Sequence, residues 1–292
     1  SEISFLNNNI ITIPIIWFSW GGDFYNLLRI RNKILLPKTK WAYYNILFAQ
    51  SKLQSLRIFI ENLIGYSSYD QSKYFLKALS KLSYMVPVMP GDYDVLNNAY
   101  PSNLKMFHLN YVNPLFIDKS SQVLNGTNIL LGNSATFSNN HFEAIDVLSK
   151  NILLQRKVVI PLSYGDKLLA KKVEKYANNK LGSKNVEVLV KFLNFNEYQK
   201  ILNSCSIVFM NHVRQQAVGN IVQALLLGSH IYLNKKSIVY DFLKRKGFYL
   251  SYIDASIKIK ELAPKQKRTN NILAHQVFGV KQQHNSLRVL LE

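Results

Sequence analysis

The amino-acid sequence predicts an α/β protein with a doubly wound parallel sheet in its C-terminal part. Short runs of branched apolar residues, which are typical of buried strands, recur along the chain after residue 126. Each run is followed by a helical pattern, and small or polar residues separate the two. Strict alternation of strands and helices indicates one parallel sheet that carries helices on both faces.

Five strands and five helices are expected from this pattern. The strands are predicted over residues 128–132, 157–161, 186–190, 206–210 and 230–233. The helices are predicted over residues 139–151, 166–179, 195–205, 216–227 and 237–246, with further helix in the C-terminal tail. Ligands of such sheets bind at the carboxyl ends of the strands, so the residues directly after each strand are candidates for a binding site.

The N-terminal part of the chain has a less regular pattern. Strands are expected over residues 10–18, 84–88 and 104–112, and helices over 24–36, 40–64 and 70–82. Asn113-Pro114 breaks the pattern, and the polar stretch that follows predicts an interlobe linker over residues 113–126. We therefore expect an N-terminal lobe over residues 1–118 and a C-terminal lobe over residues 119–292.

Composition excludes some classes of protein. The longest apolar run, residues 10–18, is interrupted by Thr12 and Pro14; it is too short to span a bilayer, and no basic segment of a signal peptide precedes it. Cys205 is the single cysteine, so no intramolecular disulfide forms. We expect Cys205 to be a buried structural thiol rather than a nucleophile, which indicates a reducing compartment such as the cytoplasm.

A net charge of +19 predicts affinity for an anionic partner: nucleic acid, an acidic membrane surface or a phosphorylated substrate. Gene base composition that enriches lysine is the alternative explanation. No acidic residue occurs over residues 24–60, where cations interleave with apolar residues. Such a surface suits an anionic leaflet, although a helix that packs inward and solvates its charges remains an equal alternative. The cations concerned are Arg29, Arg31, Lys33, Lys38 and Lys40.

Two strand ends have the residues of an anion site. Gly132, Asn133 and Ser134 follow one predicted strand, and His141 lies at the start of the next helix. Free backbone N–H groups and the helix dipole favour an anion at such a helix start. An ordinary turn of small residues is the alternative.

The second candidate anion site is at the start of the helix predicted over residues 216–227. Arg214, Gln215 and Gln216 precede an apolar helix with Gly219 in its first turn, and cationic and amide side chains there suit a diphosphate. A solvated helix entry is the alternative, and His212 nearby is either a phosphate donor or a structural histidine. Together the two sites suggest a nucleotide diphosphate. The glycine-rich motifs of dinucleotide oxidoreductases and P-loop NTPases are absent from the sequence.

Carboxylates are scarce in the sequence. Asp23 follows a predicted strand and is either a general base or a helix N-cap. Asp92 and Asp94 form a D-x-D pattern typical of one metal-dependent glycosyltransferase class, but they lie outside the regular domain. We therefore expect neither a metal ion nor another cofactor.

Four segments resemble those of the bacterial 4-acetamido-4,6-dideoxygalactose (Fuc4NAc) transferases of enterobacterial common antigen synthesis, which form glycosyltransferase family 56. Residues 17–25 resemble their W-x-x-W-G-x-D-x-Y segment, and residues 129–134 with Asn140-His141 resemble I-L-V-G-N-S…N-E-H. Residues 157–164 are similar to V-V-V-P-x-x-Y, and residues 214–219 to A-R-Q-Q-G-I-G. Order and spacing agree from about residue 15 to residue 243, which is most of the chain.

This resemblance implies a GT-B fold of two Rossmann-like lobes, with a complete C-terminal doubly wound sheet and a short or truncated N-terminal lobe. It implies a metal-independent, hexosyltransferase-type enzyme at the cytoplasmic face of the bacterial inner membrane. The donor would be dTDP-Fuc4NAc and the acceptor an undecaprenyl-diphosphate-linked saccharide; an anionic membrane surface would be a partner and nucleic acid would not.

The resemblance also implies roles for single residues. In the leading hypothesis, which rests on its position after a predicted strand, Asp23 would accept the proton of the acceptor hydroxyl. Tyr164, Lys191 and Asn194 would lie near the nucleoside. The donor diphosphate would be bound by the two candidate anion sites, which comprise Gly132, Asn133, Ser134, His141, Arg214, Gln215, Gln216 and Gly219.

The sequence departs from the family pattern in three places. Only sixteen residues precede Trp17, where relatives have a longer segment, so an inactive sugar-nucleotide or membrane-binding remnant is an alternative to the enzyme. Ala217 stands where relatives have the first glycine of their motif, and Gly22 replaces an alanine. Because related enzymes of O-antigen synthesis use other sugars, the sugar itself is not predicted. A basic nucleic-acid-binding protein is a third hypothesis, which rests on the charge alone.

Overall fold

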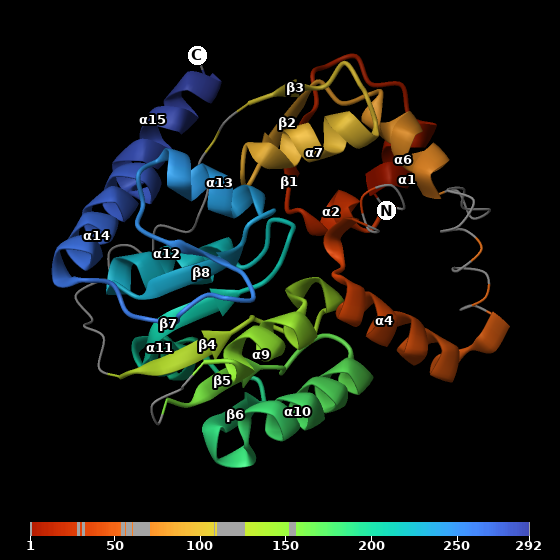
Figure 1. Ribbon diagram of the computed structural model, residues 1–292. Helices are drawn as coiled ribbons and strands as arrows, with labels where there is room; N and C mark the ends of the chain where they lie inside the picture. The colour runs from red at the N-terminus through yellow and green to blue at the C-terminus, as the bar shows by residue number, and fades with distance from the viewer. Residues whose placement is uncertain are drawn as a thin grey trace.

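The computed structural model describes residues 2–27, 30, 33–53, 56, 60, 71–107, 109, 126–151 and 156–291. These residues form two separate parallel sheets, a smaller one near the N-terminus and a larger one that follows it (Figure 1). The predicted combination of α/β structure and parallel sheets is thereby confirmed.

The larger sheet has six strands in the order β6-β5-β4-β7-β8-β9, and every neighbouring pair is parallel. Five of them match the predicted strands, whereas the short β9 was missed because three residues show no periodicity. The strands are β4 (Asn128–Leu131), β5 (Val158–Pro161), β6 (Val186–Leu189), β7 (Cys205–Met210), β8 (His230–Asn234) and β9 (Ser251–Ile253).

Helices cover both faces of this sheet. Alternate strand residues point to opposite faces, so Leu130 and Val208 enter one apolar core while Ile129 and Phe209 enter the other. The first core includes side chains of α11 (Phe195–Asn203), α12 (Val218–Leu227), α13 (Ile238–Arg245) and α14 (Pro264–Phe278). The second includes those of α9 (His141–Ser149) and α10 (Lys167–Leu181). Two short 3-10 turns, η1 (Phe137–Asn139) and η2 (Ser183–Asn185), precede α9 and β6.

The smaller sheet has the order β1-β2-β3 and is also parallel. Its strands are β1 (Ile16–Ser19), β2 (Tyr84–Pro87) and β3 (Lys105–Met106). Its helices are α1 (Glu2–Asn8), α2 (Gly22–Tyr25), α6 (Gln71–Leu79) and α7 (Gly91–Ala99), of which α1 and α7 were not predicted.

Two strand predictions in this part of the chain were too long. The strand expected over residues 10–18 begins only at Ile16, because Pro14 has no N–H to donate and Ile10 and Ile13 are exposed. The strand expected over 104–112 is described only as β3, and its later residues lie largely outside the described ranges. The helix expected over 40–64 is observed as α4 (Pro37–Gln50), and most of its remaining residues lie outside the described ranges. Residues 113–125 of the predicted linker also lie outside them.

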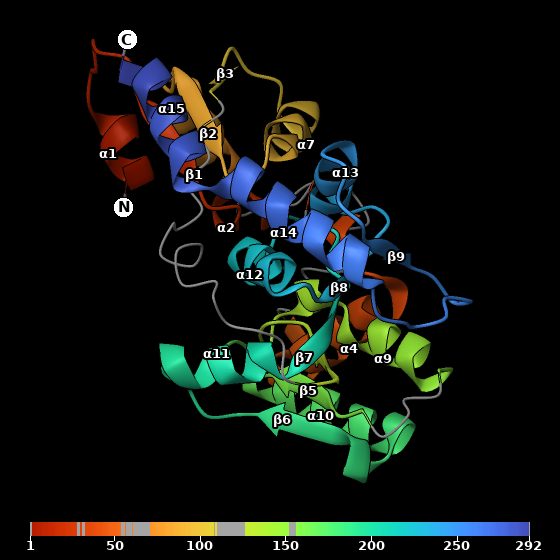
Figure 2. The ribbon, with the colours of Figure 1, turned by 90° about the vertical axis from the view of Figure 1, so that its left-hand side faces the viewer.

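Helices from each end of the chain approach the sheet of the other end. Helix α4 packs against α9, with Ala42 and Ile46 in the second core of the larger sheet (Figure 1). The backbone N–H and hydroxyl of Thr39 both donate to the Glu143 carboxylate of α9, at 2.9 and 2.6 Å. At the other end, α15 (Val280–Leu291) leaves the larger sheet and reaches the level of the smaller one in both views (Figure 2).

Gly165 tests how tightly the carboxyl edge of the larger sheet is packed. Its φ is +110°, and an added Cβ would overlap the carbonyl oxygen of Ala135, with which Gly165 forms a bridge. We predict that Gly165→Ala lowers the free energy of unfolding by about 3–5 kcal/mol, because strain and overlap add. Chemical denaturation measures this change.

The matched control is Gly182→Ala. Gly182 also has a positive φ, +82°, but the nearest atom to its added Cβ lies 3.7 Å away. Gly182→Ala should therefore lower the free energy of unfolding through backbone strain alone, by about 1–2 kcal/mol. Equal losses for the two variants would contradict the packing argument.

Candidate functional site

The topology of the larger sheet creates a crevice between β4 and β7. From β4 the chain proceeds to β5 and β6 on one side, then returns to form β7 on the other side of β4. The connections after β4 and β7 therefore leave in opposite directions, and ligands of open α/β sheets bind at such a switch point. Both candidate anion sites predicted from sequence lie in these two connections.

Gly132 ends β4 in a conformation that needs glycine. Its φ is +68°, and its N–H donates to the Phe209 carbonyl of β7 at 3.0 Å. An added Cβ would lie 2.7 Å from Nε2 of His141 and 3.1 Å from Oδ1 of Asn139. The glycine thus allows the first residue of α9 to lie directly against the β4 backbone.

Gln216 joins the two predicted sites by direct hydrogen bonds. Its Nε2 donates to Oδ1 of Asn133 at 2.7 Å, and its Oε1 accepts from the Ser138 hydroxyl at 2.6 Å. Asn133 Nδ2 in turn donates to the Tyr164 hydroxyl at 2.8 Å. Residues from the ends of β4, β5 and β7 therefore meet in one polar cluster, in which Ser134 is also buried.

Asn139 and Asn140 support this cluster and were not predicted as site residues. Asn139 Nδ2 donates to the Ser134 carbonyl at 2.9 Å and to Thr136 Oγ1 at 2.9 Å. Asn140 adopts the left-handed conformation, and its Nδ2 donates to the Asn211 carbonyl at 3.0 Å. The sequence signal was the Asn-Asn pair before a helix, since asparagine tolerates this conformation better than most residues.

The helices that begin at the crevice, α9 and α12, differ from α10 and α11 in how they are capped, although α13 also has no side-chain cap. Asp166 caps α10 and Asn194 caps α11 through their side chains, but the N-cap residues of α9 and α12 make no such bond. Those N-caps are Asn140 and Ala217, both left-handed. The first backbone N–H groups of α9 and α12 are therefore not occupied by a cap side chain, which suits an anionic ligand.

Two buried histidines lie next to these helix starts. Burial lowers the pKa of His141 to about 4 and that of His212 to about 3, so both are neutral at pH 7. His212 Nδ1 is 3.1 Å from the Arg214 carbonyl oxygen. Within the described residues, the buried Nε2 of each ring has no hydrogen-bond partner.

Arg214 is partly buried at the end of β7, beside the smaller sheet. Its guanidinium lies over the ring of Tyr25, 5.6 Å from the centroid, and burial lowers its pKa. The Tyr25 hydroxyl donates to Oδ1 of Asp92 at 2.7 Å. Among the described residues Arg214 forms no ion pair, so its guanidinium donors are oriented without being used.

Asp92 is unsuited to the metal role that its D-x-D pattern suggested. It is fully buried, its Oδ2 accepts from the Met89 N–H at 3.2 Å, and burial raises its pKa to about 7. Asp94, by contrast, is exposed. In the ranges that the structure covers, no group of three or more His, Cys, Asp or Glu side chains is arranged to hold a metal ion.

Asp23, the predicted general base, lies at the start of α2 and is exposed. Its Oδ2 accepts from Trp17 Nε1 at 3.2 Å and from the backbone N–H of Trp20 at 3.0 Å. It is not the N-cap of α2, because Gly21 has that position. Gly21 in turn contacts Gln215, since an added Cβ there would overlap Oε1 of that side chain, so Asp23 stands beside the contact between the lobes.

The residues predicted near the nucleoside are spread along the crevice edge. Tyr164 contacts Asn133, whereas Lys191 and Asn194 follow β6, which is an edge strand two places from β4. Lys191 is exposed, and Asn194 Oδ1 accepts from the Glu197 N–H at 3.0 Å. Gly219 is the second residue of α12. The structure therefore brings Tyr164 into the polar cluster and leaves Lys191 and Asn194 at its periphery.

The predicted basic surface is divided between two environments. Lys33 is exposed and Lys40 is partly buried. Lys38 pairs with Asp146 of α9, which raises the pKa of Lys38, and its side chain is 57% exposed. Arg29 and Arg31 lie outside the described residues.

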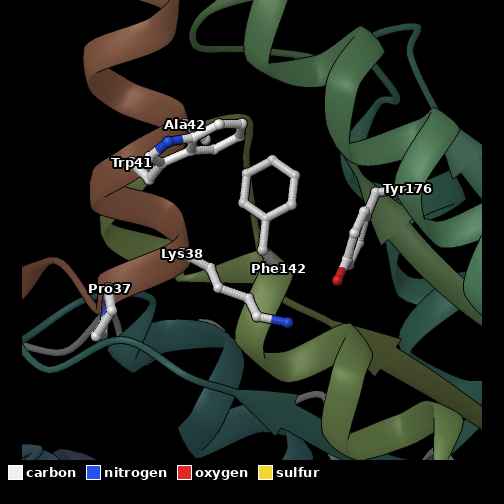
Figure 3. Close-up of a pocket in the computed structure, with 6 residues that line it drawn as sticks. All are labelled: Pro37, Lys38, Trp41, Ala42, Phe142 and Tyr176. Carbon is white, nitrogen blue, oxygen red and sulfur yellow. The ribbon is translucent and has the colours of Figure 1, made fainter.

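An open groove lies between α4 and the start of α9 (Figure 3). Its volume is about 470 Å³, and Lys38 and Tyr176 face Asp146 along one wall. Trp41 on its rim is 72% exposed. The groove is lined by Pro37, Lys38, Trp41, Ala42, Phe142 and Tyr176.

No described helix is long and apolar enough to cross a bilayer.

Ala217 provides a test of the backbone at the crevice. Its φ is +55°, a conformation that costs an alanine about 1–2 kcal/mol and costs glycine little. We therefore predict that Ala217→Gly raises the free energy of unfolding by about 1 kcal/mol. Ala170→Gly, inside α10, is the control and should lower it by about 1 kcal/mol. A loss of stability in both variants would contradict the strain at Ala217.

Comparison with solved structures identifies the fold. A glycosyltransferase from Rickettsia africae matches with TM-score 0.55 and 13% identity, over 74% of this chain and 65% of that one. Anabaena Alr3699/HepE, in complex with UDP and glucose, matches with TM-score 0.56 and 16% identity, over 76% and 66%. The UDP-forming α,α-trehalose-phosphate synthase from Burkholderia vietnamiensis matches with TM-score 0.56 and 8% identity, over 82% and 65%. The chain thus has the GT-B fold, and it spans less than two thirds of the length of these structures.

The family is shown by sequence. A profile described as "4-alpha-L-fucosyltransferase glycosyl transferase group 56" matches residues 90–283, which is more than half of the chain. The matched region includes the whole crevice between β4 and β7 and both helix starts. The family inferred from the four sequence segments is confirmed, three of these segments lie within the matched region, and the chain belongs to glycosyltransferase group 56.

Proposed function

We propose that this protein transfers a Fuc4NAc-like deoxy-amino sugar from a dTDP-sugar to a polyprenyl-diphosphate-linked saccharide in bacterial surface polysaccharide synthesis. The observation that carries the proposal is the pair of helix starts without side-chain caps at one switch point, with Arg214 beside them. That arrangement suits the diphosphate of a nucleotide-sugar. Anabaena Alr3699/HepE, which shares the fold, is described in complex with UDP and glucose.

The leaving group would be stabilised without a metal ion. When the bond from the anomeric carbon to the diphosphate breaks, negative charge develops on the released oxygen. Arg214 and the N–H groups of α9 and α12 would neutralise it, because dipoles fixed before the reaction need no reorganisation. Gln215, Gln216, Ser134 and His141 would position the diphosphate, and Gly132 and Gly219 would let it approach the backbone.

The nucleoside would extend from this site along the crevice edge toward β6. Tyr164 is 55% exposed beside Asn133, and Lys191 and Asn194 lie further along. Phe192, next to Lys191, is 84% exposed, and an exposed aromatic ring offers a stacking surface for a base. These residues would select the base, while the phosphate contacts would be common to several nucleotides.

The acceptor hydroxyl would approach from the smaller sheet, where Asp23 would take its proton as the new glycosidic bond forms. Because the proposed acceptor is lipid-linked, the reaction would take place at the cytoplasmic face of the inner membrane. Lys33, Lys40 and the exposed Trp41 and Phe48 of the α4 region combine charge with aromatic surface, which suits an anionic leaflet. This surface and the groove beside α4 support a peripheral membrane location.

The first test is nucleotide binding. Calorimetry with dTDP, UDP and GDP should show tightest binding of dTDP, and Arg214→Ala should weaken it roughly 10–100-fold, because a charge-assisted contact is lost. Arg245→Ala, which removes an exposed arginine from α13, is the matched control and should bind as the wild type does. Unchanged dTDP affinity in Arg214→Ala would remove Arg214 from the site.

The second test separates binding from transfer. Asp23→Asn should reduce transfer from the dTDP-sugar to a polyprenyl-diphosphate saccharide roughly 100-fold or more, with dTDP affinity retained. Transfer at the wild-type rate would place the base elsewhere. A wild-type protein that binds dTDP but transfers to no lipid-linked acceptor would support the non-catalytic alternative instead.

A further inference from the structure

Arg214 is held by an aromatic ring rather than by a carboxylate. Its guanidinium lies over Tyr25 at 5.6 Å, and no ion pair to it occurs among the described residues. A carboxylate partner would use the guanidinium N–H groups, which lie in one plane and are the donors that bind a phosphate. A ring face attracts the cation and leaves those donors available.

We propose that Tyr25 and Asp92 are positioning residues for Arg214, which hold its guanidinium ready for the donor diphosphate. The inference rests on the proposed function, because it takes Arg214 to be the diphosphate ligand. Neither residue touches the diphosphate in this scheme. Both belong to the helices of the smaller sheet, so the proposal assigns that lobe a role in donor binding.

Asp92 fixes the ring and strengthens its attraction for the cation. The Tyr25 hydroxyl donates to Asp92 Oδ1 at 2.7 Å, and both residues are buried. A hydroxyl that donates to a carboxyl oxygen leaves its own oxygen richer in electrons, because hydrogen bonds in a chain polarise one another. The Met89 N–H holds the other carboxyl oxygen, so Asp92 cannot rotate toward Arg214 without losing a bond.

The backbone around Arg214 is held by the same lobe. The Gln215 N–H points to the Tyr25 hydroxyl at 3.5 Å, and Val213 packs against the core of the smaller sheet. Gly21 has no side chain, which lets the Gln215 amide lie against the turn before α2. Ring and backbone contacts together give the arginine one orientation.

Calorimetry on the full chain with dTDP tests the proposal. Tyr25→Leu removes the ring and should weaken binding roughly tenfold, and Tyr25→Phe keeps the ring without its hydroxyl and should weaken it roughly threefold. Tyr93→Phe removes a hydroxyl that donates to the Leu104 carbonyl at 2.8 Å in the same lobe, and it should bind dTDP as the wild type does. Equal affinity of wild type and Tyr25→Leu would overturn the proposal.

A double-mutant cycle distinguishes positioning from general structural damage. If Tyr25 acts through Arg214, Tyr25→Leu should cause no further loss of dTDP affinity in the Arg214→Ala background. A merely structural role would give the same fold loss in both backgrounds, which would contradict the proposal. In turnover, Tyr25→Phe should raise KM with little change in kcat if the orientation serves donor binding.

A readout without ligand separates this inference from the proposed function. In the free protein, the Nε–Hε resonance of Arg214, assigned by its loss in Arg214→Lys, should be shifted upfield by the Tyr25 ring. Retention of that shift in Tyr25→Leu, or its absence in the wild type, would overturn the positioning. A wild type with the shifted resonance but no affinity for dTDP, UDP or GDP would support the ring contact and contradict the diphosphate role.

Discussion

The position of β7 beside β4 is the constraint on which the site depends. Because the chain reverses its direction across the sheet there, α9 and α12 start at one crevice and run back along opposite faces. Their positive ends would be separated if β4 and β7 were not neighbours. Gln216 spans the crevice and satisfies its amide on Asn133 and Ser138, so the two connections are linked by hydrogen bonds rather than by apolar packing. Buried amides without such partners would be costly.

The crevice carries strain where the backbone approaches it. Asn140 and Ala217 are the non-glycine residues with positive φ in the described chain, and each is the N-cap of one of the two helices. Strained backbone at a helix start persists only where the surroundings determine it, as the bonds of Asn140 to Ile34 and Asn211 do. The left-handed φ of Ala217 is one that glycine adopts at little cost, which agrees with the glycine of the family motif that residues 214–219 resemble.

The local pattern of apolar residues in the sequence predicted the strands of the larger sheet well. It predicted none of the contacts between the lobes. Strands such as β7 are fully buried runs of branched residues, and their type can be read without knowing their neighbours. Tyr25 and Asp92 are 67 residues apart, and the bond from Asn140 to Ile34 spans 106 residues. No periodicity encodes such pairs. The ion pair of Lys38 was missed for the same reason, since its partner Asp146 lies on a helix of the other sheet.

The arrangement of residues around Arg214 relates the net positive charge of the chain to one particular site. Excess lysine and arginine alone would attract any polyanion, but among the described residues Arg214 contacts an aromatic ring and forms no ion pair with a carboxylate. Asp92 is buried behind the Tyr25 ring with both oxygens bonded, and Asp23 is bonded to Trp17 and Trp20. The guanidinium of Arg214 therefore remains available to a ligand although Asp92 lies close enough to interact with it. In the proposed scheme, the smaller lobe contributes to anion binding by the way it holds its acids, without supplying a cation of its own.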